Sequence, residues 1–517
     1  ERYGHGKDET YQNQNERRTP NMERLAAQGM VFSNAYACAV CSPTRCSLMS
    51  GMNAARHRVT DWTLGVDQRD RFTSNGEGLY PPRWAANGLQ PPGTQKTGRC
   101  ASPWLRDGNN KYWQPDPLDE SQWKDYSMTY PFMNVLTFPQ VLKNNGYRTI
   151  HVGKAHWGSG NGPYNQAYTA RTNGGSTPGA DPRQLGFDVN IAGAEHGGPA
   201  TYVGKDKYGD GTGNHHMTPG LDENNYYADN VFLTDALTTE AIKALDQAKT
   251  NGKPFYLYMA HYAIHSPLDA RAWDHSRSDS TNLDADTKNP NPNDGLDWNV
   301  TERNYGTLIK GMDDSLGKLL DWLKANGELD NTLFVFMADN GGLSVSGRLT
   351  NANAPARAGK GSCYEGGTRE PLIVAWPGKI QAGSVSHEPV IIEDFYPTIL
   401  EAAGVPVPGQ EALATTDYEG ETVRQVIDGE SFLPVLLGQR TTVRADGAAR
   451  PLLWHYPNKW GEGPNGKAYN FYSALRLGRW KLIYQHSDRS FELYDLEEDI
   501  SESRNLAAHL PAKVEEL

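Results

Sequence analysis

The sequence is poor in cysteine and has no long apolar run. Only five of its 517 residues are cysteine, and three of these lie within the segment Cys38–Cys46. An odd and sparse set is not the framework of a disulfide-stabilised protein. A local disulfide, a metal knuckle or a plain structural role for Cys38 and Cys46 all remain open. No stretch approaches the ~20 apolar residues of a membrane-spanning helix, so we expect no membrane span.

An excess of positive charge is also missing. The chain has 50 basic and 62 acidic residues, a formal net charge of −12. This balance argues against a nucleic-acid partner, and an anionic substrate would have to be recognised by a few focused cations. The 53 glycines and 32 prolines indicate long ordered loops rather than disorder, because tryptophan and tyrosine are scattered throughout.

The pattern of apolar residues predicts an α/β fold. At 517 residues the chain exceeds a typical single domain. Apolar segments expected as strands alternate with amphipathic segments expected as helices. The expected strands are 30–36, 149–153, 255–260, 332–338 and 371–377, and the expected helices are 19–29, 138–146, 234–249 and 305–326. Such strands form a large, mostly parallel sheet sandwiched by helices, with functional residues at their carboxyl ends.

The last part of the chain follows a different pattern. Short alternating segments there predict a small antiparallel sheet. These segments are 474–476, 480–484 and 491–494. We therefore expect a catalytic domain, 1–442, and a C-terminal α+β subdomain, 443–517. Two loop-like insertions, 61–130 and 159–225, interrupt the first domain.

One segment near the N-terminus stands out chemically. Residues Cys41–Arg45 read Cys-Ser-Pro-Thr-Arg, and Leu-Met-Ser-Gly follows at 48–51. The first expected strand delivers Cys41 to a loop, and Pro43 suits the first turn of a helix after it. The free N–H groups and the dipole at a helix N-terminus favour negative charge. Cys41 is therefore placed where an anionic group would be stabilised.

Polar residues with catalytic potential follow the next three expected strands. Lys154 and His156 stand two residues apart after the second strand, so both can project toward one site. His265 follows the third strand and could protonate a leaving group. Asp339 and Asn340 follow the fourth strand and offer hard oxygen ligands, which suit Ca²⁺ or Mg²⁺ rather than zinc. Asp-Asn-Gly is also an ordinary turn sequence.

These motifs resemble a known family when they are taken in order. With the segment Gly359–Pro371, which reads GKGSCYEGGTREP, they are similar to the motifs of type I, formylglycine-dependent sulfatases. They resemble in particular the bacterial carbohydrate sulfatases of the alkaline-phosphatase-like superfamily. It implies that a formylglycine-generating or anaerobic sulfatase-maturating enzyme oxidises Cys41 to formylglycine, whose hydrate is the nucleophile. It also implies a periplasmic or secreted location.

The resemblance assigns roles to the residues around the nucleophile. Arg45 would orient the hydrate, and Lys154 and Lys360 would neutralise the sulfuryl oxygens. His265 would protonate the leaving oxygen, and His156 would take up a proton during sulfate release. Glu365 and Arg369, which follow Lys360 in the same segment, would hold this loop in place.

The metal that the resemblance implies is Ca²⁺, or alternatively Mg²⁺. Asp339, Asn340 and the modified Cys41 would hold it. Family members carry two further ligands, an Asp-Asp pair at the end of a first strand. That strand would precede residue 1, and the nearest acids, Asp8 and Glu9, lie in a polar stretch. We therefore expect the first strand to be missing from this sequence.

The implied substrate is a sulfated saccharide. Residues suited to stacking on sugars or binding sulfate occur in or beside the two insertions, although the same composition suits loop packing. They include Arg58, Trp62, His215 and His216. The alternatives are an arylsulfatase, a phosphatase or phosphodiesterase of the same fold, and an inactive homologue that binds sulfated glycans. The cysteine motif argues against a phosphatase, which usually carries threonine or serine as nucleophile.

Overall fold

The computed structural model describes most of the chain outside the two insertions. It covers residues 19–57, 60, 111–112, 124–125, 135–157, 182–193, 197–206, 208, 221, 226–227, 231–268, 300–344, 353–409, 413–416, 422–459, 469–486 and 488–517.

The secondary structure contains every element expected from the apolar pattern, with ends a few residues away. The helices are α2 (Pro20–Gln28), α3 (Cys41–Ser50), α4 (Ala54–His57), α6 (Phe138–Asn144), α8 (Leu233–Thr250), α9 (Val300–Ala325), α10 (Glu365–Thr368), α11 (Phe395–Ala402), α12 (Leu433–Leu436) and α13 (Pro511–Glu516). The strands are β1 (Met30–Tyr36), β2 (Lys111–Tyr112), β3 (Lys124–Asp125), β4 (Arg148–Gly153), β5 (Val189–Ile191), β6 (Phe255–Ala260), β7 (Phe334–Met337), β8 (Arg369–Ala375), β9 (Ser384–Ser386), β10 (Val390–Ile391), β11 (Ala414–Thr416), β12 (Thr422–Arg424), β13 (Leu452–Lys459), β14 (Asn470–Leu477), β15 (Trp480–Gln485) and β16 (Ser490–Asp495).

The two largest groups of described strands before residue 443 form the centre of the catalytic region, and β2-β3 and β11-β12 are separate two-stranded sheets. One group has the order β10-β1-β8-β7, with β9 also paired to β1. In it, β8 is antiparallel to both of its neighbours, whereas β9 and β10 are parallel to β1. The other group has the order β5-β4-β6 and is parallel throughout. The fold is thus α/β and mostly parallel, as the sequence predicts.

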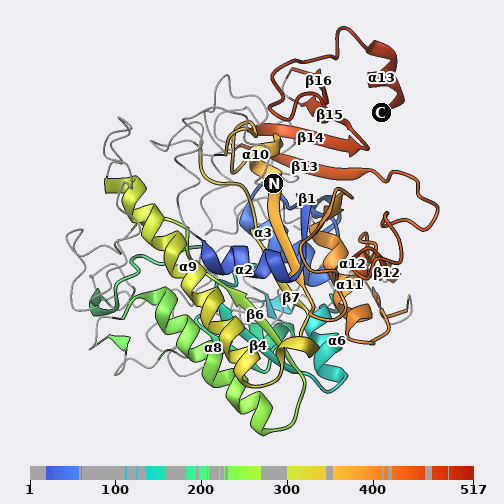
Figure 1. Ribbon diagram of the computed structural model, residues 1–517. Helices are drawn as coiled ribbons and strands as arrows, with labels where there is room; N and C mark the ends of the chain where they lie inside the picture. The colour runs from blue at the N-terminus through green and yellow to red at the C-terminus, as the bar shows by residue number, and fades with distance from the viewer. Residues whose placement is uncertain are drawn as a thin grey trace.

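Helices cover both faces of these strands. On one face α8 and α9 run side by side (Figure 1), and Leu257 and Met259 of β6 pack beneath them. On the other face lie α3, α6 and α11, which contact Tyr256 and Tyr258 of the same strand. Successive side chains of a strand point to opposite faces. Because both faces are covered, β6 is apolar at every position rather than alternating.

The C-terminal strands form the predicted antiparallel sheet, with the order β13-β14-β15-β16. This sheet lies beside α10 and β1 (Figure 1). Its inner face belongs to the same apolar cluster as β1 and β8. The indole Nε1 of Trp454 also donates a hydrogen bond of 2.8 Å to the carbonyl oxygen of Ala37. The sheet is therefore packed directly against the segment that leads to Cys41.

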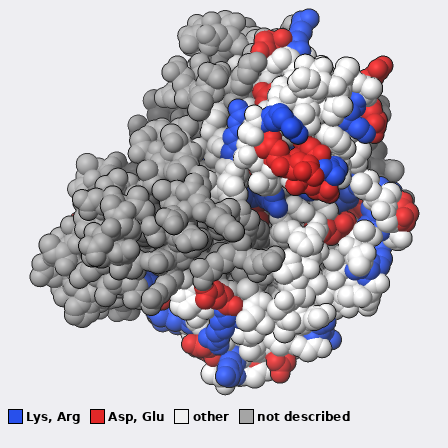
Figure 2. All heavy atoms as spheres, turned by 45° about the horizontal axis from the view of Figure 1, so that its top comes forward, with Lys and Arg blue, Asp and Glu red and all other residues white. Residues whose placement is uncertain are grey.

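Charged side chains of both signs are interspersed over the described surface in Figure 2. Acidic groups gather in one patch on this face, and basic groups border it.

A cavity separates the two groups of strands. Its volume is about 1430 Å³, and every residue of β6 and of β7 lines it. Among the described strands, β6 and β7 each have a pairing partner on one side alone. Although they are apolar, their side chains are mostly only half-buried. One edge of each strand therefore faces the cavity instead of a neighbouring strand.

Candidate active site

Cys41 is the first residue of α3 and is 2% exposed. The helix indicated by Pro43 is thus present. The Sγ atom of Cys41 lies 3.2 Å from Nδ1 of His156. Burial by itself would raise the pKa of this thiol, but the positive charges of Lys154 and Lys360 lower it below its ordinary value. The position favours an anion, because nearby cations outweigh the loss of solvent.

Arg45 joins α3 to the ends of two strands. Its Nε and one terminal nitrogen donate to the same carboxylate oxygen of Asp339, at 2.9 and 2.6 Å. Its other terminal nitrogen donates to the carbonyl oxygen of Lys154 at 2.6 Å. Burial would raise the pKa of Asp339, yet Arg45, Lys154 and Lys360 hold it well below its usual range. Asp339 is therefore a carboxylate over the whole physiological range of pH.

Lys154 and His156 follow β4, and both side chains approach Cys41. Gly153 has φ +94°, and a Cβ atom there would overlap the carbonyl oxygen of Ala260. The Lys154 side chain is 3% exposed, and burial lowers its pKa to about 8 despite the negative charges of Cys41 and Asp339. It still carries a proton at neutral pH. Both residues lie beside Cys41, as their spacing predicts.

His265 approaches the site from the end of β6. Its Nδ1 lies 2.8 Å from the carbonyl oxygen of Ser266. A Cβ atom added at Gly198 would lie 2.6 Å from that nitrogen, and one at Gly197 would lie 2.7 Å from His156 Cε1. The segment 197–198 thus packs against both imidazole rings. Loss of solvent around His265, together with the charges of Lys154 and Lys360, lowers its pKa to about 2, so the ring is neutral.

The oxygen ligands predicted for a metal lie next to these cations. The Nδ2 of Asn340 donates to the carbonyl oxygen of Gly341 at 3.0 Å. Its Oδ1 is buried and accepts no hydrogen bond within the described part of the chain. An orphaned amide oxygen beside a carboxylate suits a hard cation. Among the described residues, no group of three or more His, Cys, Asp and Glu side chains could hold a metal ion. The donors present therefore fit Ca²⁺ or Mg²⁺ in kind and are too few in number.

The Lys360 loop (Gly359–Tyr364) closes the site from another side. The Lys360 backbone N–H donates to Gly342 at 3.0 Å, and that of Gly361 donates to Ala39 at 2.8 Å. The second bond ties this loop to the segment just before Cys41. The ammonium of Lys360 acts on the pKa values of Cys41, Asp339 and His265. All the predicted catalytic residues are therefore gathered in one place.

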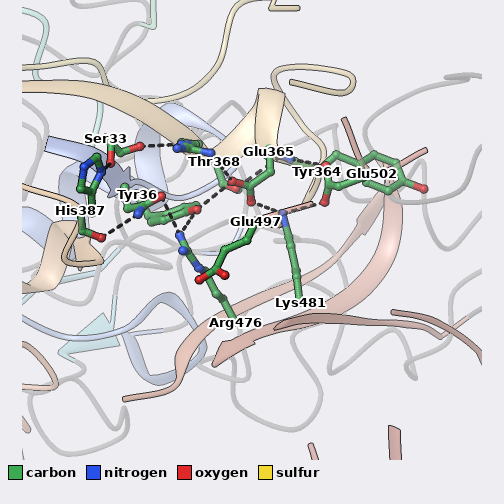
Figure 3. A network of polar contacts seen from close by, with 12 residues as sticks. Ser33, Tyr36, Tyr364, Glu365, Thr368, His387, Arg476, Lys481, Glu497 and Glu502 are labelled. Carbon is green, nitrogen blue, oxygen red and sulfur yellow. Dashed lines mark hydrogen bonds and ion pairs between the residues drawn. The ribbon is translucent and has the colours of Figure 1, made fainter. Parts of the chain in front are cut away.

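The residues that brace the Lys360 loop come partly from outside any motif. Glu365 is fully buried, and its carboxylate accepts hydrogen bonds from Tyr36, Arg369 and Lys481 (Figure 3). The sequence indicated the bracing role of Glu365 and Arg369 but not that of Lys481. A lysine in a short alternating strand looks like an ordinary surface residue, so no sequence signal identified it.

Some predictions concern residues that lie outside the described part of the chain. These are the substrate contacts Arg58, Trp62, His215 and His216, and the acids Asp8 and Glu9.

Whether the cysteines form disulfides can be answered for four of the five residues. Cys38, Cys41, Cys46 and Cys363 are all buried and unbridged.

Comparison with known proteins decides the family. The family model described as Sulfatase matches residues 5–75 and 117–405. The chain belongs to the sulfatase family. A second model, described as the C-terminal region of N-sulphoglucosamine sulphohydrolase, matches residues 359–515. This sulfatase is thus an enzyme that hydrolyses sulfate esters, and no described helix is long and apolar enough to cross a membrane.

Relatives in other organisms agree with this assignment, and solved structures share the fold. A sulfatase of Formosa agariphila is 27% identical over 524 residues, covering 96% of this chain and 80% of that protein. The N-acetylgalactosamine-6-sulfatase of Mus musculus is 27% identical over 466 residues, covering 87% and 70%. The fold is similar to the crystal structure of Ps i-CgsB (TM-score 0.59, 24% identity, 96% of this chain and 85% of that one). It is also similar to that of the sulfatase yidJ from Bacteroides fragilis (TM-score 0.60, 20% identity, 96% and 88%).

Proposed function

We propose that this sulfatase removes sulfate from a sulfated saccharide and that formylglycine derived from Cys41 is its nucleophile. The observation that carries the proposal is the environment of Cys41, which combines a helix N-terminus, an adjacent imidazole and two lysine charges. Mammalian relatives named N-acetylgalactosamine-6-sulfatase support a saccharide substrate. An enzyme that oxidises Cys41 is then a required partner, and the location is periplasmic or secreted.

The modified residue and the cation would supply chemistry that the unmodified chain lacks. The formylglycine hydrate offers an oxygen nucleophile together with a second hydroxyl, so that sulfate can leave without a further difficult hydrolysis. Ca²⁺ or Mg²⁺ held by Asp339, Asn340 and position 41 would polarise the sulfate and favour ionisation of the hydrate.

The chain's own residues perform the remaining tasks. Lys154 and Lys360 neutralise charge on the sulfuryl oxygens, because both ammonium groups act on the position of the Cys41 side chain. His156 Nδ1, 3.2 Å from Sγ, is close enough to take a proton from a hydroxyl at that position. Arg45 holds the Asp339 carboxylate in place through two hydrogen bonds.

His265 protonates the leaving alcohol in this proposal. Its ring is neutral, because loss of solvent and the charges of Lys154 and Lys360 lower its pKa. A bound sulfate ester brings a negative charge between the two lysines and raises the proton affinity of the ring. Binding of substrate therefore prepares the acid for the step in which it is needed.

The experiment is a comparison of the parent chain with Cys41→Ala after expression with a formylglycine-generating enzyme. The mass of the peptide carrying residue 41 reports the aldehyde, and sulfate release from sulfated N-acetylgalactosamine and from an aryl sulfate reports activity. We expect an aldehyde and turnover in the parent alone. Normal turnover in Cys41→Ala would refute the proposed nucleophile. Turnover of the aryl ester alone would favour an arylsulfatase.

A further inference from the structure

A group of charged side chains is fully buried between the Lys360 loop and the C-terminal sheet (Figure 3). The Nζ atom of Lys481, in β15, lies 2.7 Å from Oε1 of Glu365 and 3.0 Å from Oε1 of Glu502. All three side chains are 0% exposed. We call these three residues the Lys481 cluster. Charged residues of these types are almost never fully buried unless they are paired.

The stability of the fold does not by itself explain such a cluster. Replacing a buried ion pair by apolar residues of similar volume is often neutral or stabilising, because the ions no longer have to be desolvated. Removing one partner is strongly destabilising, since the other charge remains buried. What the ions add is orientation, because the single ammonium of Lys481 lies between the two carboxylates at short distances. The partners of Glu365 and Glu502 therefore show what the cluster orients.

Glu365 connects three separate parts of the chain. Its Oε2 accepts the hydroxyl of Tyr36, at the end of β1, at 2.7 Å. The guanidinium of Arg476, in β14, also contacts that hydroxyl. The backbone N–H of Glu365 donates to Oε2 of Glu502 at 2.7 Å. The first turn of α10, the end of β1 and the C-terminal sheet are thus joined through one buried carboxylate.

The two loops that hold the reactive groups are attached to the residues that Glu365 joins. One loop runs from Ala37 to Cys41, and its amide at Ala37 donates to Thr368 at 2.8 Å. The other is the Lys360 loop, which leads directly into Glu365 and donates from Gly361 to Ala39 at 2.8 Å. Movement of Glu365 would shift Lys360 and the Cys41 segment relative to each other.

We infer that Lys481 is a positioning residue for sulfate ester hydrolysis. It holds Glu365 and Glu502 so that the Lys360 loop keeps its place beside Cys41, although its own ammonium touches no reacting atom. The C-terminal sheet is therefore part of the catalytic apparatus and not an appendage. The kinetic part of this inference rests on the proposed function.

The first test needs no activity and uses hydrogen exchange of the unmodified full chain. Lys481→Met keeps the apolar volume and removes the cation, so we expect the amides of Ala37, Gly361 and Glu365 to exchange roughly tenfold faster or more. The matched control is Arg479→Met. Arg479 lies in the turn just before β15, and this change removes a cation that forms ion pairs near the surface with Asp495, Glu497 and Glu498. We expect no change at these amides in the control. Unchanged exchange at Ala37 and Gly361 in Lys481→Met would overturn the inference.

A second variant keeps this test decisive where Lys481→Met alone fails to fold. Adding Glu502→Gln removes one buried negative charge together with the positive one and retains an acceptor for the Glu365 amide. The pair Lys481→Met with Glu502→Gln should therefore fold and still show faster exchange at Gly361. Protection equal to that of the parent chain in this double variant contradicts the inference.

The second test is a double-mutant cycle on the matured enzyme. Displacement of a catalytic group by about 1 Å can cost roughly 10²-fold in rate, so we expect Lys481→Met to lower kcat by about that factor with little change in KM. In a Lys360→Ala background the same change should lower kcat much less, because the group that it positions is already absent. Equal losses in both backgrounds indicate a purely structural residue and overturn the inference. Absence of turnover in the matured parent counts against the proposed function, and the exchange test still decides the role of Lys481.

Discussion

At the scale of single residues, the site is governed by a few charges that outweigh burial. Cys41 and Asp339 both lose solvent, which favours their neutral forms, yet Lys154 and Lys360 lower both pKa values. Lys154 is buried as well and retains its proton because those two anionic positions face it. The site is a set of mutually supporting charges, so removal of one charge alters the others.

Replacement of Lys154 by methionine tests this mutual support. The variant keeps the apolar stem and loses the ammonium that faces the sulfuryl oxygens, so kcat should fall by about 10²–10³-fold. Lys143→Met is the matched control, because Lys143 is 38% exposed and pairs with Asp188 at 3.1 Å away from Cys41. Steady-state sulfate release measures both variants. A kcat within a few-fold of the parent in Lys154→Met would show that this lysine does not act on the substrate.

A second residue-scale prediction concerns Glu393, beneath the helix that begins at Cys41. The side chain is 2% exposed, and burial, together with the neighbouring carboxylates of Asp394 and Asp428, raises its pKa to about 8. Between pH 4.5 and 8 the folded state therefore holds a proton that the unfolded state releases. Stability should fall as pH rises through this interval, by about 1.4 kcal/mol per pH unit from this group.

Glu393→Gln removes this dependence, because glutamine does not titrate. Denaturant midpoints of the parent should decrease from pH 6 to pH 8 relative to those of the variant. Parallel midpoints across this range would mean that Glu393 is ionised in the folded state.

The motif residues of the site could be predicted from sequence, because they follow apolar strands and resemble the motifs of the sulfatase family in their order. Lys481 could not be predicted, since its burial depends on pairing with Glu365, 116 residues away in the sequence, and with Glu502. Periodicity alone marks Lys481 as one residue of an alternating strand. The chemistry that explains it appears only when three segments meet.

At the scale of elements, the end of β4 shows how the backbone positions side chains. Gly153 has φ +94° and lies against Ala260 of β6 with no room for a Cβ atom. The next residue, Lys154, donates its backbone N–H to the carbonyl oxygen of Ala260 at 2.7 Å. The contact between two strand ends therefore determines where the ammonium of Lys154 points.

Gly153→Ala should separate these strand ends. We expect a loss of about 3 kcal/mol in the free energy of unfolding, from the left-handed backbone and the collision together. Gly252→Ala is a matched control, since Gly252 has φ +62° and nothing within 4 Å of an added Cβ, and should lose about 1 kcal/mol. Chemical denaturation gives both values. Equal losses in the two variants would show that the close contact with Ala260 is tolerated.

The existence of these elements follows from sequence, but their directions do not. The apolar segment at β8 was expected as a further strand of a mostly parallel sheet, and it runs antiparallel to both β1 and β7. The direction of a strand relative to its neighbours depends on the path of the connecting segments, which the amino-acid composition does not encode. The strands β9 and β10 are only three and two residues long, too short to give a periodic signal.

At the scale of the whole molecule, the cavity between β6 and β7 divides the catalytic region. A chain lengthened at its N-terminus by an apolar strand ending in two aspartates should pair with both edges and add ligands for the cation. We expect a higher Tm, and a further rise with Ca²⁺ in the lengthened chain alone. A strand of the same length ending in two asparagines should raise Tm without the response to Ca²⁺. If neither strand changes Tm, the cavity does not accept a further strand.

The pairing of β1 has a consequence for the order of events during synthesis. Its partners among the described strands, β8, β9 and β10, all lie far along the chain, and Ile391 follows Tyr36 by 355 residues. At about 5–20 residues per second, a ribosome needs roughly 20–70 s to make this stretch. During that interval β1 has none of these partners. Once the strands pair, Cys41 is only 2% exposed. An enzyme that oxidised this thiol would have to reach it before β1 pairs, and the strand order sets the shortest length of that interval.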